Sequence, residues 1–267
     1  MIMIKSYDAV KRAVHEAGNM AMEYFGRLSS LSVTEKGHLD LVSEADREIE
    51  KFLTAAIMKE FPDDGILGEE GADRKGRSGR VWVLDPIDGT FNFLRGRSCW
   101  VVSVGVFANN RPEFGIINAP VRKQFFSGGP DHGAECNGIP LEPVKKFNPL
   151  MGIMNIEFHP DLITLEQRLD VLHYVMQDMA LTFRHNGCAA MSLMEVALGE
   201  VDAYLGLGES SWDVMGALPI LSALGYQNSI NWTETALSDK LRFFSAKSEL
   251  VPLLAALLKK VGVSEPH

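Results

Sequence analysis

The stretch Val81-Trp82-Val83-Leu84-Asp85-Pro86-Ile87-Asp88-Gly89-Thr90 decides how the rest of the chain is interpreted. Four apolar residues, typical of a buried strand, run directly into two aspartates, and Gly-Thr follows them. Carboxylates at a strand end are ligands that a hard cation such as Mg²⁺ prefers. Gly89 would let a backbone N–H group approach an anion closely, and a helix starting there would point its N-terminus at that anion. An Asp-Pro turn, with glycine for a positive φ, is the alternative interpretation.

Three acidic segments elsewhere could bring further oxygen ligands to the same site. Glu69 follows Ile66-Leu67-Gly68, although a solvated loop would have a similar sequence. Asp46 ends Leu41-Val42-Ser43-Glu44-Ala45-Asp46, a pattern that also fits a helix capping box with Ser43. Asp213, after Ser211-Trp212, stands in the first turn of an apolar helix, where an acid also interacts favourably with the helix dipole.

Composition indicates an acidic globular protein. The chain has 267 residues, 26 Lys+Arg against 35 Asp+Glu, and a formal net charge of −9. This charge argues against non-specific nucleic-acid binding, and an anionic substrate would need a metal or a helix terminus. Cys99, Cys136 and Cys188 form no Cys-x-x-Cys pair, which disfavours a disulfide framework or a zinc site. Neither a signal sequence nor a membrane span is predicted, so we expect a cytoplasmic protein.

Apolar spacing predicts an α+β fold in two packed halves, residues 1–149 and 150–267, without a linker. In the first half we expect helices over about 9–25 and 43–61 with a strand over 31–35 between them. An antiparallel sheet is then expected from strands near 81–84, 100–107, 114–117 and 124–127. In the second half we expect helices near 165–176, 189–197, 214–223 and 248–258, and strands near 181–184, 203–207 and 241–245.

Together, Leu-Val-Ser-Glu-Ala-Asp (41–46), Gly-Glu-Glu (68–70), Asp-Pro-Ile-Asp-Gly-Thr (85–90) and Trp-Asp-Val (212–214) resemble the motifs of the inositol monophosphatase family. These are Mg²⁺-dependent, lithium-sensitive phosphatases, and within the family the chain resembles the bacterial SuhB-type members. The resemblance extends from the first helix to the last. It implies a layered αβαβα sandwich and a homodimer. It also implies that a metal-activated water hydrolyses inositol 1-phosphate or a similar small polyol phosphate.

The resemblance further implies a role for each matching residue. One Mg²⁺ would be bound by Glu69, Asp85 and the Ile87 carbonyl, and a second by Asp85, Asp88 and Asp213, with a weaker third ion near Glu69. The catalytic residues would be Glu69, Thr90 and Asp46, with Asp46 orienting the Thr90 hydroxyl beside the nucleophilic water. The substrate-binding residues would be Ile87, Asp88, Gly89, Thr90, Gly187, Cys188, Ala189 and Asp213. Bound cations would turn these carboxylates into a local positive site for phosphate.

Two positions depart from the family pattern. Cys188 stands where Ser or Thr is common, and Gly206 stands where inositol-specific members have a glutamate for the ring hydroxyls. The natural substrate could therefore instead be histidinol phosphate, 3′-phosphoadenosine 5′-phosphate or fructose 1,6-bisphosphate.

Other enzyme classes fit the sequence less well, whereas a non-catalytic role stays open beside the phosphatase activity. A haloacid-dehalogenase phosphatase needs Asp-x-Asp, whereas Asp85 and Asp88 are one residue further apart. The chain has no P-loop, no His-x-x-x-His pair and no Gly-x-Ser-x-Gly elbow. SuhB-type members can also act as non-catalytic protein partners in transcription antitermination complexes, and this role stays open. No direct nucleic-acid contact is expected, since an aromatic stripe and a basic block are both missing.

Overall fold

Two amphipathic helices form the outer layer of the first half. The computed structural model describes residues 7–37, 40–159 and 161–261. Helices α1 (Asp8–Phe25) and α2 (Glu44–Glu60) bury apolar side chains every three to four residues, as predicted. Between them, a 3₁₀ turn (Leu28–Ser30) leads into a hairpin of β1 (Val33–Gly37) and β2 (Asp40–Ser43). The strand predicted over 31–35 therefore begins two residues later, after the turn.

The first sheet has eight strands in the order β10-β9-β8-β7-β6-β5-β3-β4. Their bounds are β3 Gly65–Gly68, β4 Asp73–Arg74, β5 Val81–Asp88, β6 Val101–Ala108, β7 Arg111–Ala119, β8 Gln124–Gly129, β9 Gly133–Cys136 and β10 Ile139–Pro140. The four strands predicted from sequence pair antiparallel as expected, and β3, which the prediction lacked, is parallel to β5. The segment between them, which contains β4, provides the crossover that a parallel pair requires.

Strand β5 continues four residues beyond its predicted end and includes the whole Asp-Pro-Ile-Asp segment. Its pairing with β6 shifts register between Asp85 and Asp88. Pro86 has no N–H group for a strand ladder, and such an irregularity is where a sheet tolerates proline. The alternative of an Asp-Pro turn is therefore wrong, and both aspartates are held in a buried strand.

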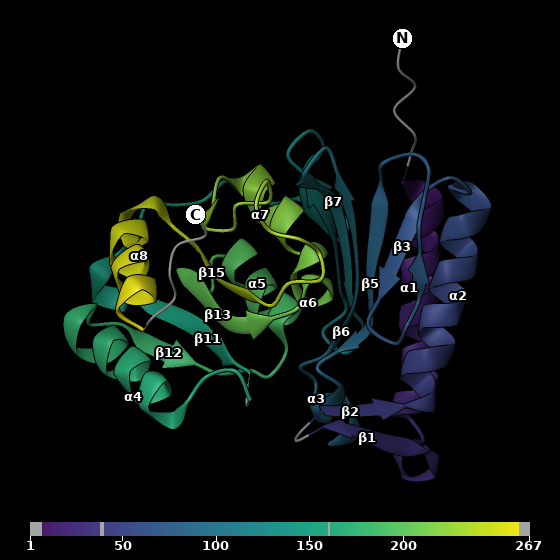
Figure 1. Ribbon diagram of the computed structural model, residues 1–267, viewed down its shortest axis with the longest axis horizontal. Coiled ribbons are helices and arrows are strands. Elements are labelled where there is room, and N and C mark those ends of the chain that lie inside the picture. Colours follow the sequence, from purple (N-terminus) through teal and green to yellow (C-terminus); the bar gives the residue numbers. More distant parts are fainter. Residues whose placement is uncertain (1–6, 38–39, 160, 262–267) are drawn as a thin grey trace.

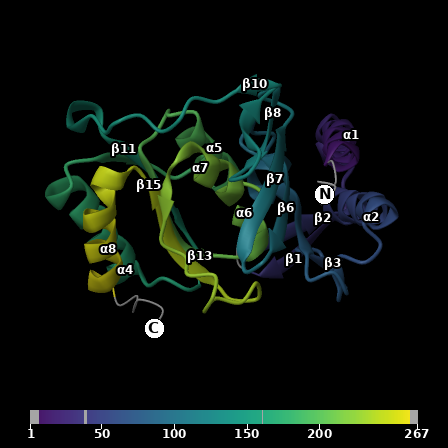
Figure 2. The ribbon, with the colours of Figure 1, turned by 90° about the horizontal axis from the view of Figure 1, so that it is seen from above.

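The second sheet has five strands in the order β12-β11-β13-β15-β14, and helices cover both of its faces (Figures 1 and 2). The strands are β11 Ile153–Phe158, β12 Thr182–Arg184, β13 Ala203–Glu209, β14 Gln227–Asn228 and β15 Leu241–Ala246. The middle helices are α5 (Ala189–Ala197), α6 (Ser211–Met215) and α7 (Leu218–Leu224), and the outer ones are α4 (Leu165–His173) and α8 (Val251–Lys260). The layers follow the predicted αβαβα order, which confirms the fold class.

Three details of the second half differ from the sequence prediction. The single helix expected over 214–223 is two helices, because Pro219 has no N–H group to extend α6 and instead stands in the first turn of α7. Helix α4 ends at His173 and continues as a π-helical turn, Tyr174–Asp178. Strand β11, to which no prediction corresponds, pairs in parallel with both β12 and β13.

The middle helices pack the two sheets into one core. All residues of α5 are buried, and one apolar cluster contains Val83, Met194, Leu221 and Phe243 from both sheets and the helices between them. Close backbone approach also depends on Gly115 of β7, where an added Cβ atom would lie 1.9 Å from the Gly216 carbonyl oxygen. The helix α6 thereby lies against β5 and β6. The division near residue 150 stays a prediction.

Candidate metal and phosphate site

Four acidic residues from three separate segments converge at one end of β5. Gly68 of β3 pairs with Leu84 of β5, so Glu69, which follows β3, comes beside Asp85 in β5. Burial, followed by the charges of Glu69, Asp88 and Asp213, raises the pKa of Asp85 well above its usual range. The structure therefore brings together the four carboxylates that the sequence singled out.

Asp88 connects this cluster to the loop before α5. Its carboxylate accepts hydrogen bonds from the N–H groups of Ala190 (2.6 Å) and Ala189 (3.3 Å) and from the thiol of Cys188 (3.2 Å). Burial and the nearby charge of Asp213 raise the pKa of Asp88 to about 7, although the Ala190 N–H group and the Cys188 thiol oppose this shift. The predicted substrate segment, residues 187–189, thus lies beside the Asp-Pro-Ile-Asp-Gly-Thr motif.

Gly89 and Thr90 form the start of the short helix α3 (Thr90–Leu94). Gly89 has φ +89°, and a Cβ atom there would lie 2.8 Å from the Cys99 carbonyl oxygen, so only glycine fits. The Thr90 hydroxyl lies 2.9 Å from the Ile87 carbonyl oxygen and 3.3 Å from Asp46 Oδ1. A short helix thus begins at Thr90, and the first backbone amides of a helix favour an anion.

Asp46 combines the two interpretations that the sequence left open. Its Oδ2 accepts the Ser43 N–H hydrogen bond at 2.8 Å and completes the capping box of α2. Its Oδ1 reaches the Thr90 hydroxyl, and the residue is fully buried. Asp46 is thus both a member of the capping box of α2 and a neighbour of the turn at Gly89 and Thr90.

Glu50 is a site residue that the sequence analysis missed. From the buried face of α2, its carboxylate accepts hydrogen bonds from the N–H groups of Glu70 and Ala72, both at 2.8 Å. An added Cβ atom at Gly68 would lie 2.2 Å from Glu50 Oε2. Glu50 therefore fixes the loop that carries Glu69, and its one sequence signal is an acid at an apolar position of the helical period.

Glu157 of β11, also missed, accepts hydrogen bonds from the predicted substrate segment before α5. Its carboxylate accepts hydrogen bonds from the N–H groups of Asn186 (3.0 Å) and Gly187 (3.1 Å) and from the Ser192 hydroxyl (2.9 Å). It also lies 2.9 Å from His185 Nδ1 and raises the pKa of that imidazole to about 9. The segment before α5 is therefore anchored by a buried carboxylate whose partners are distant in sequence.

The donor set suits a hard cation, but the side chains are not arranged around one. No group of three His, Cys, Asp or Glu side chains in the described parts of the chain is placed to hold a metal ion. Asp88 is turned toward backbone amides, Asp213 caps its own helix, and Asp85 shares a hydrogen bond with Glu69. Buried like charges with raised pKa values are nonetheless what a divalent cation would relieve. Rotation of these carboxylates, with the Ile87 carbonyl beside them, would provide oxygen ligands for Mg²⁺.

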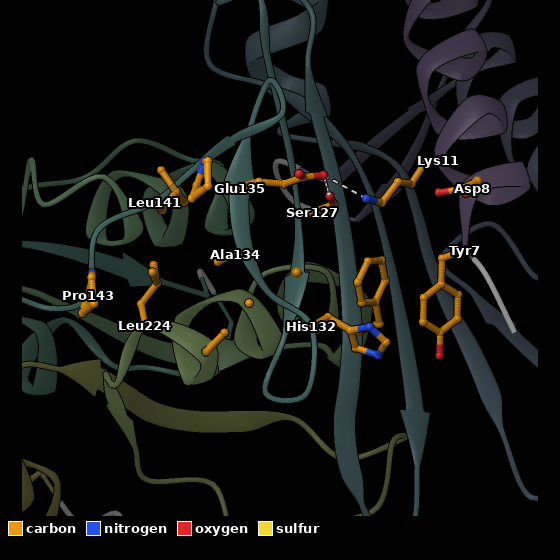
Figure 3. Close-up of a pocket in the computed structure, with 15 residues that line it drawn as sticks. Tyr7, Asp8, Lys11, Ser127, His132, Ala134, Glu135, Leu141, Pro143 and Leu224 are labelled. Atoms are coloured by element: carbon orange, nitrogen blue, oxygen red, sulfur yellow. Dashed lines mark hydrogen bonds and ion pairs between the residues drawn. The ribbon is translucent and has the colours of Figure 1, made fainter. Parts of the chain in front are cut away.

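A cavity of about 500 Å³ lies elsewhere and contains none of the predicted site residues (Figure 3). Tyr7, Lys11, Glu135 and Leu224 are among the residues that line it, and Lys11 donates a 2.8 Å hydrogen bond to Glu135. Tyr7 packs on Trp82, near the start of β5 and away from Asp88. This cavity is therefore separate from the carboxylate cluster.

The layered fold, with its acidic cluster beside a glycine-led helix start, is that of solved SuhB and inositol monophosphatase structures. The sequence profile of the inositol monophosphatase family matches residues 5–260, and the chain belongs to this family.

Two relatives and one solved structure show the range of names within the family. The chain is 32% identical over 217 residues to the Nus factor SuhB of Xylella fastidiosa, covering 80% of this chain and 78% of the relative. It is 31% identical over 267 residues to the fructose-1,6-bisphosphatase/inositol-1-monophosphatase of Aquifex aeolicus, covering 97% of this chain and 99% of the relative. The crystal structure of extragenic suppressor protein SuhB from Bartonella henselae superposes with a TM-score of 0.83 at 26% identity, covering 94% of this chain and 98% of that structure.

No helix in the described residues has the length and apolar character needed to cross a membrane.

Proposed function

We propose that the chain is a Mg²⁺-dependent phosphomonoesterase that hydrolyses inositol 1-phosphate or a similar small polyol phosphate. The observation that supports this most is the convergence of Glu69, Asp85, Asp88 and Asp213 beside the turn at Gly89. A phosphate held there would meet backbone amides on one side and the metal-binding carboxylates on the other.

The residues of the site would have separate roles in metal binding, substrate binding and catalysis. Glu69, Asp85, the Ile87 carbonyl, Asp88 and Asp213 would hold two Mg²⁺ ions, with a weaker third near Glu69. When bound, these ions supply an activated water and neutralise charge on the leaving oxygen. Asp46 accepts the Thr90 hydroxyl proton in a hydrogen bond and so orients that hydroxyl beside the phosphate. Gly89 and Thr90 bind the phosphate, while Gly187, Cys188 and Ala189 contact the polyol.

The test compares phosphate release from four substrates with and without Mg²⁺. They are myo-inositol 1-phosphate, fructose 1,6-bisphosphate, histidinol phosphate and 3′-phosphoadenosine 5′-phosphate. We expect the highest kcat/KM for myo-inositol 1-phosphate, inhibition by lithium, and no turnover in a chelator. A clear preference for the bisphosphate, in keeping with the name of the Aquifex aeolicus relative, would move the substrate assignment to sugar bisphosphates.

A second role is favoured by the name of the Xylella fastidiosa relative, a Nus factor. This chain would then also act as a protein partner in a transcription complex, as a cytoplasmic homodimer without direct nucleic-acid contact. Asp85→Asn separates the two roles, because it should abolish phosphatase activity and leave a purely protein-binding role intact. Complementation of a SuhB-deficient strain by this variant would support the second role, and failure of the variant where the wild type succeeds would argue for catalysis.

A further inference from the structure

Glu209 is a carboxylate that the proposed mechanism does not use, although it faces the same cluster. It is the last residue of β13, four positions before Asp213. The pairing of β13 with β15 shifts register between Leu207 and Glu209, and Gly208 there has φ +116°. Such a bulge re-aims the side chain that follows it. The charged neighbours of Glu209 are Asp213, Glu157 and Asp88.

One carboxylate oxygen of Glu209 is held by the protein and the other is available. Oε1 accepts a 3.0 Å hydrogen bond from the hydroxyl of Tyr204, which is fully buried and rigidly placed. Within the described residues, Glu209 has no other hydrogen bond and no ion pair, so Oε2 lacks a protein donor. A partly exposed, oriented acceptor of this kind favours a ligand that donates a hydrogen bond.

The space for Glu209 exists because Gly206 has no side chain. An added Cβ atom at Gly206 would lie 2.8 Å from Glu209 Cγ and 3.0 Å from the Tyr204 hydroxyl. Gly206 is also the parallel-strand partner of Glu157, which anchors the segment 185–187. Glu209 therefore lies on the side of the site where the polyol part of a substrate would be placed.

We propose that Glu209 is a specificity-determining residue whose Oε2 accepts a hydrogen bond from a hydroxyl group of the substrate. Gly206 admits this side chain and Tyr204 orients it. The inference rests on the proposed function and narrows it to phosphomonoesters that carry free hydroxyl groups near the phosphate.

The test measures kcat/KM for myo-inositol 1-phosphate and for cyclohexyl phosphate, the same ring without hydroxyl groups, at saturating Mg²⁺. In Glu209→Ala, the ratio of the two values should fall about 10- to 100-fold, as expected for loss of a hydrogen bond to a charged acceptor. Gly206→Ala should lower the same ratio, because its Cβ atom displaces Glu209. The exposed Glu166 of α4 offers a matched control, and Glu166→Ala should leave the ratio unchanged.

Several outcomes would overturn the assignment. An equal loss on both substrates would show a structural role, and unchanged kinetics would show no role. A higher Mg²⁺ requirement in Glu209→Gln would make Glu209 a metal ligand instead. If Glu209→Ala does not fold, as judged by thermal unfolding, Glu209→Gln and Gly206→Ala decide the question. If the wild type hydrolyses neither substrate, the proposed function itself is refuted. If the wild type hydrolyses both, the variants test only the role of Glu209.

Discussion

Removal of one buried charge from the carboxylate cluster should stabilise the metal-free protein at neutral and higher pH. Asp88 is 7% exposed, and burial with the charge of Asp213 raises its pKa from 3.8 to about 7. The folded state therefore binds a proton that the unfolded state has already released, and stability is lost as the pH rises from about 4 through about 7. Three pKa units correspond to about 4 kcal/mol. The amide in Asp88→Asn would keep an acceptor for the Ala190 N–H group but lose part of that hydrogen-bond energy, so we expect a net gain of about 2 to 3 kcal/mol.

Urea unfolding in a chelator measures this gain in Asp88→Asn at about pH 8 and at about pH 4, where the difference should vanish. Asp64→Asn is the matched control. Asp64 is also buried, but it accepts a 2.9 Å hydrogen bond from the Trp82 indole and lies 3.4 Å from Arg80. The same substitution there should destabilise the protein, because it removes favourable partners. An Asp88→Asn protein that is less stable than wild type at the higher pH would refute the account of the cluster.

Three further predictions concern residues around the cluster. The imidazole of His185 should titrate near 9 by NMR, and Glu157→Gln should return its pKa toward 6.5; its contribution to stability is complete below 6.5 and is lost as the pH rises through about 9. Glu50→Ala should lower stability by about 2 kcal/mol in urea unfolding, and kcat as well, since two N–H groups of the Glu69 loop lose their charged acceptor. Thr90→Val should keep the thermal midpoint within a few degrees but lower kcat about 100-fold, and a kcat close to wild type would exclude a catalytic hydroxyl.

Local sequence pattern was sufficient to predict the elements whose buried residues follow a regular period. Helices α1 and α2 each bury one stripe, and β5 is apolar until its aspartates, so these elements and the ligand motifs could be predicted. Strand β11 was missed although Met154 to Phe158 alternates apolar and polar residues, which is a strand signal. Its polar side chains are buried rather than solvated: Asn155 donates a hydrogen bond to Glu195, and Glu157 accepts one from the Asn186 N–H group.

The supporting residues of the site could not be predicted for a related reason. Glu50, Glu157 and Glu209 interact with backbone groups or side chains whose positions depend on the assembled sheets. Apart from the position of Glu50 on the apolar face of α2, nothing in their immediate sequence distinguishes them from surface acids. For Asp46, the capping pattern and the contact with Thr90 were both predicted, but as alternatives. The sequence did not show that one carboxylate makes both contacts, through Oδ2 and Oδ1 respectively.

We propose that the carboxylates around Asp85 bind Mg²⁺ and that this binding makes the chain a phosphatase. The most direct test is a parallel titration of Mg²⁺ in wild type and Asp85→Asn, with calorimetric binding and phosphate release from myo-inositol 1-phosphate measured together. We expect saturable binding and turnover with matching Mg²⁺ dependence in the wild type, and the loss of both in the variant. Turnover that persists in Asp85→Asn, or phosphate release from the wild type in a chelator, would contradict the account.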